Sequence, residues 1–194
     1  MNQRIIGVTG GIATGKTTVT NYLHQRYHLP ILDADLYARA AITQERLQVI
    51  QERYGAEILT PSGELNRQHL GTIIFNNKLE RRWLENLIHP YVKEQLCQNA
   101  RSVAPAPVVM AIPLLFEANL QNLVTEIWVV NCPLQLQIER LCERSHLTIE
   151  EAMQRISAQM PMTIKIAQAD VVLDNSIDLP YLWQQIDRYI NESV

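Results

Sequence analysis

The amino-acid sequence predicts an α/β protein in which helices cover both faces of a five-stranded parallel sheet. Short apolar runs alternate with segments of helical periodicity, an alternation that is typical of parallel sheets. A glycine-rich turn joins the first apolar run to the first helical segment. Two longer helical stretches, 36–102 and 146–168, interrupt the alternation. Insertions at the edge where parallel strands end often hold substrates or close over them.

The first strand, turn and helix are predicted together. An apolar run at residues 5–8 suits a buried strand, and the apolar side chains of residues 17–27 have the spacing of one helical face. Between them, Gly10, four further residues, Gly15, Lys16 and Thr17 match the pattern of a phosphate-binding loop. The loop therefore has the strand and helix around it that give the pattern its meaning.

The chemistry of this loop suits a nucleoside triphosphate. Successive main-chain amides in a glycine-rich turn form an anion site, and the helix that follows adds free amides and the positive end of its dipole. Lys16 can reach the outer phosphates, and the Thr17 hydroxyl can bind Mg²⁺. The sequence therefore predicts binding of a nucleoside triphosphate with Mg²⁺.

The remaining core elements follow from apolar runs and capping signals. Further strands are predicted at 29–33, 108–112, 127–130 and 171–173, and helices at 133–145, from Thr148 onward, and at 179–190. Thr148 and Glu151 have capping-box spacing. The helix that they begin is predicted to place these apolar residues on one stripe: Ile149, Ala152, Met153, Ile156 and Met160.

The first insertion contains no strand signal. Asn66 is a predicted N-cap, and Asn77 with Glu80 has the spacing of a second capping box. Pro90 is predicted to end one helix at His89 and to open the next, which runs to about residue 100.

Composition limits the classes of protein that fit. The chain has 194 residues, a formal net charge of −3 and 47% hydrophobic residues, which is ample for one core and gives no basic field for nucleic acid. No apolar stretch reaches the roughly 18 residues of a membrane span, and the N-terminus lacks the apolar region of a signal peptide. Cys97, Cys132 and Cys142 have no metal-type spacing and suit inert thiols. We expect a cytoplasmic protein without nucleic-acid or membrane partners.

Two acids follow the second strand. Asp33 ends it and suits a general base that takes the proton of an acceptor hydroxyl, although turn acids are also common at strand ends. Asp35 is expected to cap a helix that begins at Leu36, and a supporting role in the site is the alternative.

Arg140 and Arg144 share one helix face and could clamp a transferring phosphoryl group, while pairing of Arg140 with Glu143 is the structural alternative. The third strand lacks the acid that supports Mg²⁺ in many phosphate-loop proteins, and Asp33 or Glu117 could replace it.

Several other polar or aromatic residues are expected to have ordinary structural roles. By themselves, Gln159 and Lys165 are interpreted as exposed polar residues unless a family match gives them a role, and His89 as a structural histidine, with contact to a ligand as the alternative. The tryptophans suit a core or an interface rather than base stacking: Trp83, Trp128 and Trp183.

At its motifs, and along nearly its whole length, the sequence resembles the dephospho-coenzyme A kinase family. The segments that carry the resemblance are residues 7–18, Asp33-Ala-Asp35 with Ala38-Arg39, His89-Pro90, Pro113-Leu-Leu-Phe-Glu117, 129–133, Arg140 with Arg144, 155–159, Lys165 and 169–175. The resemblance implies ATP-dependent phosphorylation of the ribose 3′-hydroxyl of dephospho-coenzyme A, the last step of coenzyme A synthesis. It also implies one P-loop kinase unit: a core at about 1–35, 103–145 and 169–194, a substrate-binding insertion at 36–102 and a lid at 146–168.

The resemblance also implies roles for individual residues. It makes Asp33 the base, Lys16 and Arg140 the phosphate stabilisers and Thr17 the Mg²⁺ ligand. The implied ATP-binding residues are Gly10, Gly11, Ala13, Thr14, Gly15, Lys16, Thr17, Thr18, Arg144 and Asn175. The implied acceptor-binding residues are Asp33, Asp35 and His89.

The sequence leaves alternatives to this function and departs from the family at two positions. A nucleoside or nucleotide kinase is the alternative enzyme, and a nucleotide switch is disfavoured because no Asn-Lys-x-Asp stretch is present. The oligomeric state is open, with a monomer as the expectation. Ala13 stands where the family usually has glycine, and a positive φ there would restrict the loop. Asn131 stands where the family often has aspartate.

Overall fold

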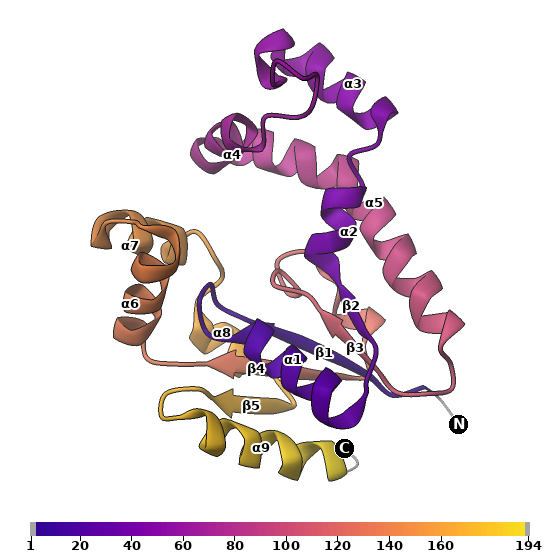
Figure 1. The fold of residues 1–194 in the computed structure, drawn as a ribbon, viewed down its shortest axis with the longest axis vertical. Coiled ribbons are helices and arrows are strands. Elements are labelled where there is room, and N and C mark those ends of the chain that lie inside the picture. The colour runs from indigo at the N-terminus through magenta and orange to yellow at the C-terminus, as the bar shows by residue number, and fades with distance from the viewer. Residues whose placement is uncertain (1–2, 193–194) are drawn as a thin grey trace. The chain divides into compact units, whose positions relative to one another are not determined.

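The computed structural model of the protein describes residues 3–192 and contains a five-stranded parallel sheet (Figure 1). The strands are β1 (Ile5–Gly10), β2 (Ile31–Asp33), β3 (Val108–Ala111), β4 (Glu126–Asn131) and β5 (Val171–Asp174). They lie in the order β2-β3-β1-β4-β5, and each neighbouring pair is parallel. The predicted α/β fold with its parallel sheet is confirmed.

Helices connect the strands and form most of the first insertion. They are α1 (Lys16–Tyr27), α2 (Ala34–Ala40), α3 (Gln44–Tyr54), η1 (Ala56–Ile58), α4 (Arg67–Asn76), α5 (Lys78–Ser102), η2 (Gln121–Leu123), α6 (Leu134–Ser145), α7 (Ile149–Ser157), α8 (Met162–Ile166) and α9 (Leu179–Asn191). The chain forms two compact units, which we call the sheet unit (Met1–Ala34 with Leu96–Val194) and the helical unit (Asp35–Gln95).

Both faces of the sheet are buried. On one face, side chains of β1, β3, β4 and β5 pack against α1 and α9 in a cluster formed by Ile6, Val8, Val19, Leu23, Val109, Trp128, Val130, Val171, Leu173, Leu182 and Ile186. The alternate residues of β3 and β4, such as Met110 and Val129, point to the other face and are also buried. Burial on both sides explains why these strands read as continuous apolar runs.

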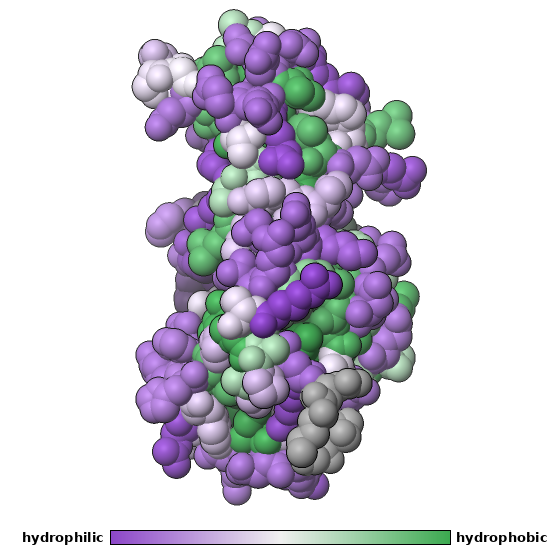
Figure 2. All heavy atoms as spheres, turned by 90° about the vertical axis from the view of Figure 1, so that its right-hand side faces the viewer, coloured by the Kyte–Doolittle hydropathy of each residue, from purple (hydrophilic) through white to green (hydrophobic). Residues whose placement is uncertain are grey.

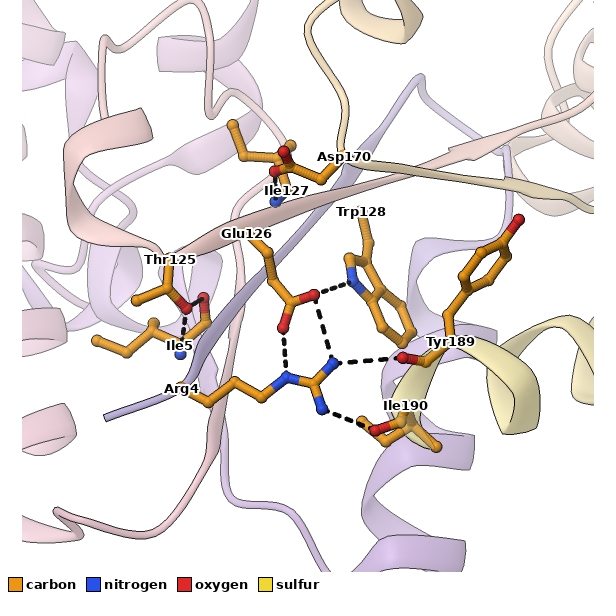
Figure 3. A network of polar contacts seen from close by, with 9 residues as sticks. All are labelled: Arg4, Ile5, Thr125, Glu126, Ile127, Trp128, Asp170, Tyr189 and Ile190. Atoms are coloured by element: carbon orange, nitrogen blue, oxygen red, sulfur yellow. Dashed lines mark hydrogen bonds and ion pairs between the residues drawn. The ribbon is translucent and has the colours of Figure 1, made fainter. Parts of the chain in front are cut away.

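A polar network in the sheet unit connects segments that are far apart in the sequence (Figure 3). Glu126 is buried at the start of β4, and its carboxylate accepts hydrogen bonds from the Arg4 guanidinium at 2.5 Å and from the Trp128 indole at 3.0 Å. Arg4 also donates to the backbone carbonyls of Tyr189 and Ile190 in α9. The network therefore joins the entry to β1, the start of β4 and the last helix at the edge of the sheet where the strands begin.

The helical unit has its own apolar core, formed by Ile50, Ile58, Leu70 and Leu84. Asn66 caps α4 as predicted, because its side chain accepts the His69 amide. The predicted capping box at α5 forms only in part. Asn77 accepts the amides of the first turn, but the Glu80 carboxylate pairs with Arg53 at 2.6 Å and not with the Asn77 amide.

Two predictions about helices are wrong. Pro90 does not divide α5, which continues from Lys78 to Ser102 with the proline inside it. The helix loses one backbone bond there, while buried residues on both sides of the proline, such as Leu84 and Leu96, hold it against neighbouring elements.

The second wrong prediction concerns α7. Its capping box forms as expected at Thr148 and Glu151. However, the helix ends at Ser157, so Met160 lies outside it. Of the stripe, Ala152 is buried and Ile156 packs against the same apolar cluster, while the side chains of Ile149 and Met153 are at least half exposed.

The face of the molecule in Figure 2 carries mostly polar side chains, with smaller apolar areas between them. Among residues 3–192, no helix combines the length and apolar character needed to cross a membrane. Cys97, Cys132 and Cys142 are unpaired thiols, and burial raises the pKa of the Cys132 thiol against the opposing effect of Arg140.

Candidate functional site

The predicted site residues of the sheet unit gather where the parallel strands end. The turn after β1 is the phosphate-binding loop, Asp33 ends β2, and Asn175 follows β5. Ligands of open parallel sheets bind at this edge because the connections that follow the strands converge there. The strand order puts β1 at the centre, with β3 between it and β2.

The backbone of the phosphate-binding loop is tightly constrained. Gly15 has a φ of 105° at the start of α1, and Ala13 has a φ of 62°, both in the left-handed region. A Cβ atom at position 15 would collide with the Asn175 amide nitrogen, so only glycine fits there. The doubt that the sequence raised about Ala13 is justified, because an alanine occupies a conformation that favours glycine.

The loop is arranged so that its carbonyls point to protein donors. The Asn175 side chain donates to the Thr14 carbonyl at 2.8 Å, and Gln137 donates to the Ile12 carbonyl at 2.6 Å. The Thr14 hydroxyl donates to the Gly11 carbonyl at 2.9 Å. At the start of α1 the first amides have no carbonyl partner within the helix. The loop can therefore present amides to an anion while its carbonyls are held elsewhere.

Lys16 and Thr17 open α1 directly after this loop. Lys16 is half-buried and Thr17 is exposed. An ammonium and a hydroxyl at a helix N-terminus are suited to polyphosphate and to a cation that travels with it. Among residues 3–192, no three His, Cys, Asp or Glu side chains are grouped to hold a metal ion.

Arg140 reaches the loop from α6. Its Nη2 atom donates to the Asn175 carbonyl at 3.1 Å, and its Nη1 atom is buried without a partner among the described residues. The expected alternative, pairing with Glu143, does not appear among the ion pairs of residues 3–192. A buried unpaired guanidinium N–H is unfavourable by itself, so Nη1 is suited to an anionic ligand. Arg144 lies one turn further on and is exposed.

Asp33 lies at the same edge as the loop. It pairs with Ala111 of β3 in the sheet register, and Ala111 pairs with Val8 of β1. Two strand spacings therefore separate the β2 end from β1, which is about 10 Å across the sheet. The end of β2, where Asp33 stands, is therefore close to the loop that follows β1.

The other two predicted acceptor residues belong to the helical unit. Asp35 lies in the first turn of α2, which begins at Ala34, so the prediction that Asp35 caps a helix starting at Leu36 is wrong. A carboxylate in the first turn still interacts favourably with the helix dipole. His89 is half-buried inside α5.

Two residues that the sequence suggested were exposed are in contact with this edge. Lys165 is fully buried, and its ammonium lies 2.8 Å from the Glu117 carboxylate and 3.5 Å from the Gly10 carbonyl. Glu117 also accepts the Met160 amide, and its second oxygen is buried without a partner among the described residues. Gln159 is half-buried and accepts the Ile12 amide at 2.7 Å. The interpretation of Lys165 and Gln159 as exposed residues is therefore wrong.

Local sequence contains no signal for these contacts. Gln137 was missed altogether, although it is buried beside the loop. A buried lysine and two glutamines look like surface residues until distant segments are brought together. The position of Lys165 and Gln159 within segments that resemble the kinase family was the one available indication.

Comparisons of sequence and of structure with known proteins point to the same family over most of the chain. A protein-family model described as dephospho-CoA kinase matches residues 4–180. The dephospho-CoA kinase of Trichormus variabilis is 56% identical over 194 residues, covering 98% of each protein. A solved structure from Thermus thermophilus aligns with a TM-score of 0.83 at 32% identity and covers 100% of both chains. Dephospho-CoA kinase from Campylobacter jejuni aligns with a TM-score of 0.72 at 26% identity, covering 97% of this chain and 96% of that one.

Proposed function

The chain belongs to the dephospho-CoA kinase family, and we infer that it phosphorylates the ribose 3′-hydroxyl of dephospho-CoA with ATP to give CoA and ADP. The observation that carries this inference is the shared sheet edge. There a phosphate-binding loop and a carboxylate, Asp33, end strands separated by a single strand, β3. This arrangement suits transfer between a polyphosphate and an alcohol.

The proposed reaction step needs a base, a donor site and charge stabilisation. The Asp33 carboxylate takes the proton of the 3′-hydroxyl, whose oxygen forms a bond to the γ-phosphorus as the bond from that phosphorus to the β,γ-bridging oxygen of ATP breaks. ADP leaves with the electrons of the broken bond. Lys16 and the unpaired Nη1 of Arg140 stabilise the charge on the transferring group.

The binding roles of the remaining site residues extend this proposal. The loop residues 10–18 hold the phosphates, and Arg144 and Asn175 contribute to the ATP site. Asp35, at the end of the first core segment, and His89, within a substrate-binding insertion at about 36–102, bind the acceptor. Residues 146–168 form a lid that excludes water and so limits hydrolysis of ATP. The core comprises about 1–35, 103–145 and 169–194.

Mg²⁺ is the proposed metal, and the exposed Thr17 hydroxyl is the group that would bind it. Mg²⁺ bound to nucleotide phosphates keeps several waters and needs only one or two protein oxygens, so a site of this kind fits it. When bound, the ion would neutralise phosphate charge. Glu117 is a second candidate, because its Oε2 atom has no partner among the described residues, while its Oε1 atom accepts from both Lys165 and Met160.

We propose that the protein is cytoplasmic and monomeric. Three unpaired cysteines suit a reducing compartment. Light scattering of the purified protein with chromatography tests the monomer.

The test of the function is an acceptor panel. The protein is incubated with ATP, Mg²⁺ and, in separate reactions, nucleosides, nucleotides and dephospho-CoA, and products are identified by mass. We expect one phosphoryl group on dephospho-CoA and ATP consumption that depends on that acceptor. Phosphorylation of a nucleotide or nucleoside instead, or ATP consumption without an acceptor, would overturn the proposal.

A further inference from the structure

The tip of the phosphate-binding loop is held at one peptide unit by two glutamines from distant segments. The Ile12 amide donates to Gln159 Oε1 at 2.7 Å, and the Ile12 carbonyl accepts from Gln137 Nε2 at 2.6 Å. Gln137 lies in α6, and Gln159 lies between α7 and α8. Both polar groups of this peptide are therefore satisfied by side chains outside the loop.

Apolar contacts reinforce this attachment. Ile12 and Ala13 pack against a cluster of buried side chains from α6 and α7, formed by Ile138, Leu141 and Ala152. The loop tip is thus held by side-chain packing on α6 and α7 and by main-chain hydrogen bonds to α6 and to the α7–α8 connection. Because the tip is closely packed against these segments, a shift of the segments would also move the tip.

The approach of Gln137 to the loop is close. A Cβ atom on Gly11 would lie 2.5 Å from Gln137 Nε2, so the glutamine amide rests against a bare glycine. Gln137 is 2% exposed, which makes its contact with the Ile12 carbonyl a buried hydrogen bond. Buried groups of this kind are costly to leave unpaired.

We propose that Gln137 and Gln159 are positioning residues for ATP binding, which hold the Ile12 peptide and so keep the neighbouring loop amides in the arrangement that binds phosphate. Neither side chain is assigned a contact with substrate. Both act through the loop, and they link its shape to the position of α6 and of the α7–α8 connection. This inference rests on the proposed function only in naming ATP as the ligand.

The polarity of the two hydrogen bonds gives a sharp test. The Ile12 amide can only donate, so Gln159→Glu keeps an acceptor in place. The Ile12 carbonyl can only accept, so Gln137→Glu sets an oxygen against an oxygen. Both substitutions add the same charge near the loop. Gln137 is buried and Gln159 is half-buried, so the difference between the two glutamate variants reports the hydrogen bonds together with the greater cost of a buried charge at position 137. The comparison of Gln159→Leu with Gln159→Glu is made at one site and is free of this second effect.

The measurement is the ATP dissociation constant, by calorimetry without acceptor, together with the melting temperature. Gln159→Leu should weaken ATP binding about tenfold, because the loss of a hydrogen bond of about 1.4 kcal/mol raises the dissociation constant by that factor. Gln159→Glu should stay within about threefold of the wild type, and Gln137→Glu should bind at least about tenfold more weakly than Gln159→Glu. The KM for dephospho-CoA should change less than about twofold in Gln159→Leu, because the effect is confined to the loop.

Gln154 provides the matched control, since it is exposed in α7 and lies outside these contacts. Gln154→Leu and Gln154→Glu should bind ATP like the wild type. Wild-type ATP affinity in Gln159→Leu, or equal effects of the two glutamate substitutions, would overturn the proposal. If Gln137→Glu does not fold, the test is the comparison of Gln159→Leu with Gln159→Glu. Equal ATP affinity in those two variants would then contradict the proposal.

Failure of the proposed function looks different. In that case the wild-type protein does not phosphorylate dephospho-CoA, while the ATP-binding differences among these variants remain measurable.

Discussion

Ala13 shows how a single backbone angle constrains the loop. A residue other than glycine in the left-handed region costs about 1–2 kcal/mol. Its methyl group packs beside the cluster on α6 and α7, where one buried carbon contributes about 0.8 kcal/mol. The packing offsets much of the strain, which explains how alanine is tolerated at a position where glycine is the natural choice.

We therefore expect Ala13→Gly to change the free energy of unfolding by less than about 1 kcal/mol, because relief of strain, loss of the methyl group and greater freedom of the unfolded chain nearly cancel. Ala13→Val should destabilise by about 1–3 kcal/mol, since a β-branched residue is poorly accommodated at positive φ. Urea denaturation measures both. Equal stability of the valine and alanine proteins would contradict the φ of 62°.

Asp33 carries the proposed proton transfer. General-base catalysis is worth about 10²–10⁴-fold, so Asp33→Asn should lower kcat by that factor and leave the ATP dissociation constant nearly unchanged. Steady-state kinetics and calorimetry give the two quantities. Asp35→Asn is the companion variant, with a raised KM for dephospho-CoA and a smaller change in kcat. A kcat within a few-fold of the wild type in Asp33→Asn would show that Asp33 is not the base.

At the scale of elements, a cluster of charged and aromatic side chains joins α3 to α5 within the helical unit. The Arg53 guanidinium of α3 pairs with Glu80 of α5 at 2.6 Å and lies 4.6 Å from the centre of the Trp83 ring. Tyr54 donates to the same carboxylate at 2.7 Å. These bonds lower the pKa of Glu80 to about 2, with Arg53 as the main cause, while burial first and then the Glu80 hydrogen bond raise the pKa of Tyr54 to about 12.

The lowered pKa predicts how the stability of the helical unit depends on pH. The pair stabilises the folded state fully above pH 4.5, the ordinary pKa of a glutamate, and the contribution is lost as pH falls toward about 2. The melting temperature of Glu80→Gln should therefore lie below that of the wild type near neutral pH, and the two should converge below pH 4.5. Glu64→Gln, in an exposed turn, is the control and should follow the wild type throughout. A constant difference across this range would contradict the assignment.

On the scale of the whole sheet unit, the Arg4–Glu126 pair joins the entry to β1 to the start of β4. Glu126 is 4% exposed, and removal of its partner would leave a buried carboxylate uncompensated. Arg4→Met should therefore destabilise the protein by about 3–5 kcal/mol. Arg4→Met with Glu126→Gln should recover most of this loss, because no charge remains buried. Denaturation of the wild type, of Arg4→Met and of the double variant measures their free energies of unfolding. A double variant no more stable than Arg4→Met would refute this explanation.

Much of the fold could be predicted because its signals are local. The apolar runs of the five strands, the phosphate-binding loop between β1 and α1, and the caps at Asn66 and Thr148 each depend on a few neighbouring residues. Pro90 and α7 show where local rules fail. A proline signals a break, but packing on both sides can keep one helix continuous, and the apolar spacing of α7 does not by itself bury its side chains.

The sequence alone determined the strand, loop and helix that are proposed to bind phosphate, the parallel sheet, and the resemblance that names Asp33, Lys16 and Arg140. Only the tertiary structure decided that Lys165 is buried against Glu117, that Arg140 keeps an unpaired nitrogen, and that two glutamines hold the loop tip. The physical reason is distance along the chain. Gln159 and Ile12 are 147 residues apart, and a hydrogen bond between a side chain and a remote amide leaves no periodic pattern in either segment.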